Sequence, residues 1–380
     1  MSRINKVIYL DNNATTRTDP RVLERMLPYF SEHYGNASSK LHPYGWVAEE
    51  AVDKAREQVA ALLSCRPDEI VFTSGATEAV NLALFGLFET YQNQGKHIIT
   101  VKTEHRAVLD TCEALTQRGA RITYLGVDPE GRIDQDELKA AICPDTILVS
   151  IMAANNETGV LQDLEQIAEL CRHYKLLFFS DATQYAAKYP ISVKEIGLHA
   201  LAFSAHKFYG PKGVGALYLS RNKPRLQIQT QVYGGGQQDG IRAGTLNVAG
   251  IVGMGAAAEI ALSEYWEESA RISVLRNHFE HQLLELNGLR INGSTKYRLY
   301  NTSNLCFPLN LKLRSLLPRY AFSSGSACSS ASAEPSHVLK ALGLSEEDIR
   351  NSFRFSFGRF STMEDVEAVV KDILNLCAQV

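Results

Sequence analysis

Apolar residues occur along the middle of the chain in short runs that alternate with amphipathic segments. The runs predict buried strands at Ile70–Thr73, His97–Val101, Arg121–Leu125, Thr146–Ile151, Leu176–Ser180, Ala200–Ser204 and Gly215–Leu219. The amphipathic segments between them predict helices, among them Ala76–Phe88, Ala107–Arg118 and Leu164–Tyr174. Buried strands separated by helices indicate an α/β domain with a mostly parallel, seven-stranded sheet. The last two strands are too close for an intervening helix, so we expect them to pair antiparallel.

After about Gly255 the pattern changes. A long helical stretch from Ala256 to about Leu286 leads into a mixed region. Ser345 with Asp348, and Thr362 with Asp365, have the spacing of capping boxes that open two short helices. This region predicts a smaller α+β domain.

Composition narrows the function classes. With 380 residues, 45% of them hydrophobic and 21% charged, the chain is typical of a globular protein of about two domains. A formal net charge of -3 provides no positive field for nucleic acid or an anionic membrane. We expect no signal peptide and no membrane span, since no apolar run is long enough. The seven scattered cysteines form no C-x-x-C pair, which favours a reducing cytoplasm over a disulfide or zinc framework.

Polar residues follow the predicted strand Ala200–Ser204, in the order Ser204, Ala205, His206, Lys207, before a glycine-rich turn. Ligand chemistry in α/β sheets lies at the carboxyl ends of strands. A lysine there can form a Schiff base if its surroundings lower its pKa, and Ser204 and His206 can bind a phosphate beside it. A surface lysine in a turn is the structural alternative, which the neighbouring motifs disfavour.

Two further strand ends have matching chemistry. Asp181 follows an apolar run, where an acid can pair with a protonated pyridine nitrogen, and Gln184 lies within reach of a ring's phenolic oxygen. An N-cap role for Asp181 remains open. The segment Gly75-Ala76-Thr77 joins a strand to a helix, where free N–H groups and a hydroxyl suit a phosphate. A plain helix start is the alternative here.

Three single residues extend this set. His105 follows a strand and can stack on a planar ring and move protons, although a lone histidine is more often structural. Asn156 follows another strand and can bind a substrate or cofactor oxygen. In Phe353-Arg354-Phe355-Ser356-Phe357 the alternation predicts a strand with three phenylalanines on one side and Arg354 on the other. Arg354 can bind a carboxylate, or can be a solvated edge residue.

Cys328 lies in a run of small polar residues, from Ser323 to Ser332. A structural cysteine normally has apolar neighbours, so a thiol on such a loop is a candidate nucleophile. The alternative is an ordinary loop with an incidental cysteine.

Together these segments resemble the NifS/IscS-type cysteine desulfurases, which belong to the class-V aminotransferase family and to the fold-type I pyridoxal-phosphate enzymes. The resemblance covers essentially the whole chain. It rests on the motifs above and on Tyr9–Thr16, Gly35–Ser39, Thr103–His105, Asn155–Gly159, Arg242–Thr245 and Arg354–Arg359. It implies a large pyridoxal-phosphate-binding domain of residues 15–258. It also implies a small domain of residues 1–14 and 259–380, which carries the Cys328 loop and Arg354.

The resemblance also implies roles for these residues. Lys207 would form the Schiff base with pyridoxal 5'-phosphate, Asp181 would pair with its ring nitrogen, Gln184 would bond its phenolic oxygen, and His105 would stack on it. The phosphate-binding residues would be Gly75, Ala76, Thr77, Ser204, His206 and, from the partner subunit of a homodimer, Thr245. Arg354 and Asn156 would bind the carboxylate of L-cysteine. Lys207 would remove the α-proton, and the Cys328 thiolate would take the substrate sulfur as a persulfide and leave alanine.

The resemblance leaves the sulfur acceptor open. The stretch Asn304–Arg319 looks shorter and more basic than is usual in the family, and the chain ends soon after Arg359. Iron–sulfur cluster assembly, tRNA thiolation and DNA phosphorothioation are therefore all open as pathways, with an acceptor or scaffold protein as partner and no direct nucleic-acid binding. Alternative functions are another fold-type I enzyme, a selenocysteine lyase above all, or an inactive scaffold. The complete set of Lys207, Asp181, His105 and Cys328 disfavours the scaffold.

Overall fold

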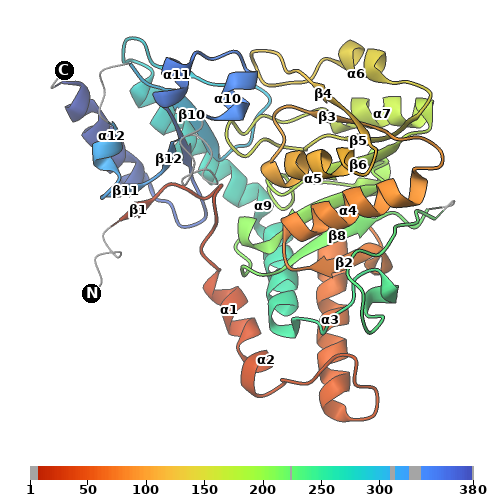
Figure 1. The fold of residues 1–380 in the computed structure, drawn as a ribbon. Helices are drawn as coiled ribbons and strands as arrows, with labels where there is room; N and C mark the ends of the chain where they lie inside the picture. Colours follow the sequence, from red (N-terminus) through yellow and green to blue (C-terminus); the bar gives the residue numbers. More distant parts are fainter. Residues whose placement is uncertain (1–6, 223–224, 309–312, 325–334, 379–380) are drawn as a thin grey trace.

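The computed structural model describes residues 7–222, 225–308, 313–324 and 335–378 (Figure 1). Its centre is a seven-stranded sheet with the strand order β2-β8-β7-β6-β5-β3-β4. The strands are β2 (Ile70–Thr73), β3 (His97–Val101), β4 (Arg121–Leu125), β5 (Thr146–Ser150), β6 (Leu177–Asp181), β7 (Ala200–Ser204) and β8 (Gly215–Leu219).

The predicted sheet is confirmed, including its one antiparallel member. Neighbouring strands from β7 to β4 are parallel, whereas β8 pairs antiparallel with both β7 and β2. Three predicted boundaries move by one residue, among them the start of β6, which is at Leu177 and not at Leu176. Strand β5 ends at Ser150, and β6 extends to Asp181, because Asp181 pairs with Ala202 and its carbonyl accepts from the Ala153 N–H at 3.0 Å. Asp181 is therefore the last residue of its strand.

Helices cover both faces of this sheet. On one face pack α4 (Ala76–Tyr91) and α5 (Arg106–Thr116), and their apolar side chains share a core with β3, β5 and β7. The other face is covered by α3 (Pro43–Leu62), α7 (Leu164–Tyr174), α8 (Val193–Ile196) and the first half of α9 (Val248–Leu283). The remaining helices of this part are α1 (Pro20–Met26), α2 (Pro28–Ser31) and α6 (Gln135–Ala141).

Helix α9 begins two turns earlier than predicted. Its first turns are rich in glycine and alanine, which weakened the helical pattern, but Asn247 caps them by accepting from the Gly250 N–H at 3.1 Å. The small residues allow close packing, because a Cβ at Gly255 would lie 2.7 Å from the Ala55 Cα in α3. By length and composition α9 could cross a membrane, yet 67% of its most apolar window is buried inside the protein. It is a core helix.

The C-terminal part forms a second layer of structure beside the large sheet (Figure 1). A four-stranded antiparallel sheet has the order β12-β13-β10-β9, and β1 pairs in parallel with β11. The N-terminal end contributes β1 (Ile8–Tyr9) to this layer. Its other elements are β9 (Arg290–Ile291), β10 (Thr302–Cys306), β11 (Tyr320–Ala321), β12 (Ser323–Ser324), β13 (Ser352–Ser356), α10 (His337–Ala341), α11 (Glu346–Arg350) and α12 (Met363–Cys377).

The predicted alternation in β13 is confirmed. Phe353, Phe355 and Phe357 lie in the core of the small sheet, and Arg354 points to the other side. The Thr362–Asp365 capping box at α12 is also confirmed. At α11 Ser345 accepts from the Asp348 N–H, but the Asp348 carboxylate bonds the Ser345 hydroxyl instead of its N–H. The division at residues 14/15 and 258/259 stays a prediction, and α9 runs through the second boundary without interruption.

Candidate active site

A cavity of about 600 Å³ lies at the carboxyl ends of the central strands, where the two sheets meet. It is lined by residues from both parts of the chain. Among its lining residues are almost all of those predicted from the sequence: Gly75, Ala76, Thr77, His105, Asn156, Asp181, Gln184, Ser204, His206, Lys207 and Arg354. The topology of the sheet thus brings residues more than 250 positions apart into one site.

Lys207 lies in the short turn Ala205–Lys207 that follows β7. Its Nζ donates to the main-chain oxygens of Asn13 at 2.7 Å and Ala14 at 2.9 Å. The turn is anchored on both sides, since β7 precedes it and the Gly210 N–H returns to the Ala205 carbonyl at 2.9 Å. The amine is therefore held inside the cavity by the N-terminal segment.

Asp181 and Gln184 lie beside this lysine, at the end of β6. Both side chains are buried. Asp181 Oδ1 accepts from the Thr183 N–H at 2.9 Å, which orients the carboxylate as a cap of the following turn. Gln184 Nε2 donates to the Asn13 carbonyl at 2.8 Å, the same oxygen that accepts from Lys207. In the described chain no helix follows Asp181 directly, so the helix N-cap role that the sequence left open is wrong, and its carboxylate caps a turn in the cavity wall.

The start of α4 and the end of β7 form a cradle suited to a phosphate. Gly75 is the N-cap residue of α4, and a Cβ built on it would meet only Ser204 Oγ, at 3.8 Å. Gly75, Ala76, Thr77 and Ser204 all line the open cavity of about 600 Å³. The surrounding donors are the first N–H groups of α4, the hydroxyls of Thr77 and Ser204, and the basic residues His206 and Lys212. This donor set fits the phosphate of pyridoxal phosphate.

His206 contacts the N-terminal segment as well. Its Nδ1 lies 3.0 Å from Thr15 Oγ1. Burial lowers the pKa of His206 to about 4, and the positive charges of Lys207, Lys212 and Lys188 act in the same direction. Without a bound anion the imidazole is therefore neutral, and it can become a charged donor when a phosphate arrives.

His105 is the N-cap residue of α5. Its Nδ1 accepts from the Ala107 N–H at 3.1 Å, which fixes the plane of the ring at the cavity wall. The structural role that a lone histidine usually has is thus present here. The ring also lines the cavity, next to the space for a planar ligand.

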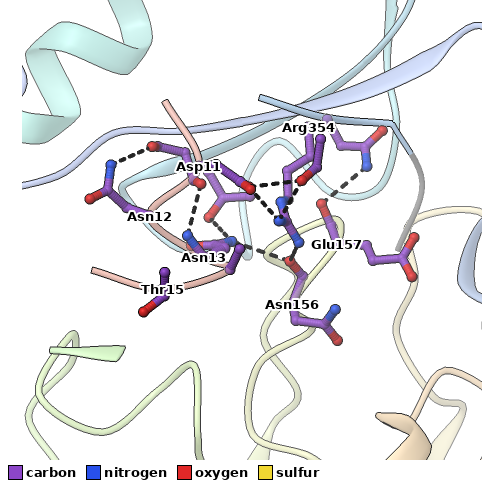
Figure 2. Close-up of polar contacts among 12 residues, drawn as sticks. Asp11, Asn12, Asn13, Thr15, Asn156, Glu157 and Arg354 are labelled. Carbon is purple, nitrogen blue, oxygen red and sulfur yellow. Dashed lines mark hydrogen bonds and ion pairs between the residues drawn. The ribbon is translucent and has the colours of Figure 1, made fainter. Parts of the chain in front are cut away.

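Arg354 reaches the cavity from β13, and Figure 2 shows its contacts. Nη1 donates to the Asn156 carbonyl at 2.8 Å, and Nη2 donates to Asp11 Oδ1 at 2.6 Å and to Ser323 Oγ at 3.2 Å. Its side chain is 1% exposed, so the alternative of a solvated edge arginine is wrong. The cause is the register of β13, which has β10 and β12 on its two sides. A guanidinium fixed in this way can bind a substrate carboxylate.

Two of the predicted residues are not among those that line the cavity. Thr245 is exposed and lies outside the cavity formed by the described residues of its own chain, so its role stays a prediction that depends on a partner subunit. Cys328 lies outside the described residues. The strand β12, which ends at Ser324 shortly before it, pairs with β13 beside Arg354.

Sequence reasoning missed the residues that hold the site together. Asn13 stands out, because its carbonyl accepts from Lys207 and Gln184 while its side chain donates to Thr302 Oγ1 at 2.8 Å. The motif Tyr9–Thr16 was noted only as part of a resemblance. The only local signal was the run of polar residues that directly follows Tyr9 and Leu10, and such a run is also typical of a solvated loop.

Two buried glutamates were also missed as structural parts of the site. Glu104 Oε1 accepts from the Met152 N–H at 2.5 Å, and Glu157 Oε2 accepts from Ser336 Oγ at 2.5 Å. Burial raises the pKa of both carboxyl groups. They connect the motifs around His105 and Asn156 to the start of α10, and their place in the motifs Thr103–His105 and Asn155–Gly159 was the available signal.

Comparison with known proteins agrees with this geometry. The profile of the family described as aminotransferase class-V matches residues 8–369. A cysteine desulfurase IscS of Anaeromyxobacter dehalogenans is 50% identical over 367 residues, which are 96% of this chain and 91% of that protein. A cysteine desulfurase IscS of Neisseria meningitidis is 50% identical over 362 residues, covering 95% of this chain and 89% of that protein.

Solved structures give the same result. A NifS-like protein superposes with a TM-score of 0.91 at 37% identity and covers 98% of this chain and 100% of its own. DndA from Streptomyces lividans superposes with a TM-score of 0.78 at 35% identity, over 91% of this chain and 98% of its own. With the fold, the cavity and these relatives in agreement, the chain belongs to the class-V aminotransferase family and, within it, to the cysteine desulfurases.

Proposed function

We propose that Lys207 binds pyridoxal phosphate covalently and that Cys328 receives the sulfur of L-cysteine. The observation that carries the proposal is the position of Lys207 Nζ in a cavity that also holds Asp181 and the phosphate cradle at Gly75–Thr77. When bound, the cofactor supplies an electron sink for the bonds at the substrate's α-carbon. Asp181 pairs with its ring nitrogen, Gln184 with its phenolic oxygen, and His105 lies along its ring.

Other residues of the chain bind the substrate, remove its proton and accept its sulfur. Arg354 and Asn156 bind the substrate carboxylate, and the Lys207 amine takes the α-proton. The Cys328 thiolate attacks the substrate sulfur, so that an S–S bond forms as the carbon–sulfur bond breaks. The electron pair of the broken bond stays with the carbon skeleton, which takes up protons and leaves as alanine. The persulfide on Cys328 is the form in which sulfur is passed on.

The cofactor assignment is tested by trapping. Borohydride reduction of the protein loaded with pyridoxal phosphate is expected to fix the cofactor on Lys207, as read by peptide mass spectrometry. Lys188 and Lys212 are internal controls, because both have contacts in or beside the cavity. Trapping on either of these lysines would contradict the proposal, as would a wild-type protein that takes up no cofactor.

The sulfur step is tested with cysteine labelled at sulfur. The label is expected on Cys328, and Cys328→Ala is expected to lose desulfuration while it keeps the cofactor's visible absorption. Cys143→Ala is the matched control, since Cys143 is partly exposed and lies at the opposite, amino ends of the strands. Desulfuration of cysteine that survives in Cys328→Ala would overturn the persulfide route.

We further propose a homodimer in which Thr245 completes the partner's phosphate site. Helices α1 and α2 and the first turns of α3 extend beyond the large sheet (Figure 1). They and the loop before α3 carry exposed apolar side chains, which mark a protein interface: Leu23, Leu27, Phe30, Tyr34, Leu41, Tyr44 and Trp46. Thr245, exposed on its own chain, is available to a second copy.

The dimer is tested by mixing inactive subunits. The heterodimer pairs a Lys207→Ala chain with a Thr245→Ala chain. If Thr245 acts in the partner's active site, one of the two sites contains both substitutions and the other site contains neither. About half of the wild-type activity is then expected, although each homodimer is impaired. Activity no higher than that of the Thr245→Ala homodimer would show that Thr245 acts within its own chain.

For the destination of the sulfur we propose a scaffold of iron–sulfur cluster assembly. The 50% identity to proteins named IscS, against 35% to DndA, favours this acceptor over one of DNA phosphorothioation. We place the enzyme in the cytoplasm, where the described cysteines, all free thiols, stay reduced. Capture of the acceptor from a lysate by protein loaded with labelled persulfide, followed by its identification, decides among iron–sulfur, tRNA and DNA pathways.

A further inference from the structure

Lys188 is a buried lysine to which none of the steps above assigns a role. It lies in the turn after β6, beside the cavity, and is 6% exposed. Its Nζ donates to Gln184 Oε1 at 2.6 Å and to Asn13 Oδ1 at 3.3 Å. Both partners belong to the network that also contains Lys207.

The environment of Lys188 is unfavourable for a cation. Burial lowers its pKa well below the ordinary value, and the positive charges of Lys207 and Arg354 lower it further. Within the described ranges no carboxylate forms an ion pair with it. On its other side a small cavity separates it from a group of titratable residues, Tyr209, Glu268, Tyr300 and Arg359. A buried amine in such a place destabilises the fold, so we expect a function that explains why Lys188 is here.

The hydrogen bonds of Gln184 supply that reason. A carboxamide has an accepting oxygen and a donating NH₂ group, and a flip exchanges the two. Lys188 donates to the oxygen, and the Asn13 carbonyl, which can only accept, takes one N–H at 2.8 Å. Both ends of the amide are therefore fixed. The group that Gln184 can still offer to the cavity is its second N–H.

This orientation matters for the ligand expected there. A phenolic oxygen that loses its proton is an acceptor, and an N–H directed at it stabilises the deprotonated form, whereas a flipped amide would present oxygen to oxygen. The same Asn13 carbonyl also accepts from Lys207 at 2.7 Å. The amide that faces the phenolic oxygen and the lysine that forms the Schiff base thus share one acceptor.

We propose that Lys188 is a positioning residue that locks the Gln184 amide with its free N–H toward the cofactor's phenolic oxygen. The proposal rests on the function proposed above. It adds a residue that acts through Gln184 and touches neither substrate nor cofactor.

The test is the pH at which the visible absorption of the bound cofactor changes, measured without substrate. Lys188→Met keeps the volume and removes the donor, and the midpoint is expected to rise by about one pH unit, which corresponds to the loss of one hydrogen bond to a charged group. Gln184→Ala is expected to give a similar rise. In the double variant the two effects should not add, because Lys188 acts through Gln184. Additive shifts would show that Lys188 acts by its own charge and would overturn the proposal.

A second variant guards against a failure to fold. Lys188→Gln keeps a neutral N–H donor, and its midpoint is expected to rise by less than half as much as in Gln184→Ala. A full rise in Lys188→Gln would assign the effect to the charge and overturn the positioning role.

The proposed function and the role of Lys188 would fail in different ways. A wild-type protein that gains no visible absorption with pyridoxal phosphate contradicts the proposed function, whereas an absorbing wild type with an unchanged midpoint in Lys188→Met contradicts only this inference.

Discussion

The Asp11 carboxylate accepts from the Arg354 guanidinium at 2.6 Å, although 343 positions separate the two residues along the chain. Asp11 follows β1, and Arg354 is in the middle of β13, so this ion pair ties the N-terminal segment to the small sheet (Figure 2). Ser323 Oγ donates to the same carboxylate oxygen at 2.9 Å. Without substrate, Asp11 is a negative charge next to the proposed carboxylate site.

Replacing Asp11 by Asn is expected to destabilise the ligand-free protein by about 3 kcal/mol, because it leaves a buried guanidinium without its charge partner. Denaturant unfolding with and without a carboxylate ligand measures this. The product alanine should restore more stability to Asp11→Asn than to the wild type, since its carboxylate replaces the lost charge. Equal stabilisation of both proteins would separate Asp11 from the substrate site.

Replacing Arg354 by Lys is expected to raise KM for cysteine about tenfold or more, because an ammonium cannot form the paired hydrogen bonds of a guanidinium. Affinity for pyridoxal phosphate should change little, as the cradle at Gly75–Thr77 is untouched. Steady-state kinetics and cofactor titration separate the two quantities. A change confined to cofactor affinity would move Arg354 out of the carboxylate site.

The cofactor-free protein is expected to lose stability as the pH falls from about 6.5 to about 4, in part through His206. Its pKa in the folded state, about 4, lies below its ordinary value of 6.5, so the unfolded chain binds more protons in this window. The contribution of His206 is therefore complete above pH 6.5 and is lost as the pH falls. Unfolding of His206→Asn at pH 7 and pH 5 should show a smaller pH dependence than the wild type. The surface variant His173→Asn is the control and should behave like the wild type.

A stability prediction away from the chemistry concerns Glu280 of α9 and Arg298. Both are buried, and two hydrogen bonds of 2.6 and 2.7 Å join them. Glu280→Gln is expected to lower the free energy of unfolding by about 3 kcal/mol, because a buried charge loses its partner. The double variant with Met at both positions should recover most of this loss. The kcat of Glu280→Gln should stay near the wild-type value, and a large fall would connect this pair to the active site.

Much of this site was predictable because strand ends in an α/β sheet have a fixed relation to one another. Lys207, Asp181 and His105 each follow a buried apolar run, and parallel strands bring such positions to one edge. The first turns of α9 were not predictable from periodicity, since glycine and alanine carry little apolar signal. Their helix is stabilised by packing on α3, which only the folded chain reveals.

The roles of Asp11, Asn13 and Lys188 were hidden for a different reason. Asp11 and Asn13 depend on partners far along the chain, and a local pattern contains no information on which distant groups will lie opposite. Lys188 bonds Gln184, four positions away, but the sequence does not show that this turn is buried. Lys188 in particular follows no strand directly and looks like a solvated turn lysine. Thr245 and Cys328 remain predictions of the sequence. One depends on a second copy of the chain, and the other lies outside the described residues.

The acceptor shared by Lys207 and Gln184 is a main-chain oxygen, and this has a practical consequence for engineering. Substitution at Asn13 exchanges its side-chain bonds but leaves the carbonyl in place, so point mutations there cannot test it. A truncated variant that starts at Thr15 would keep the cavity residues supplied by the large sheet and lose the oxygen that holds both side chains. Inserting or deleting one residue between β1 and Thr15 is therefore a more direct way to move this oxygen than a point mutation.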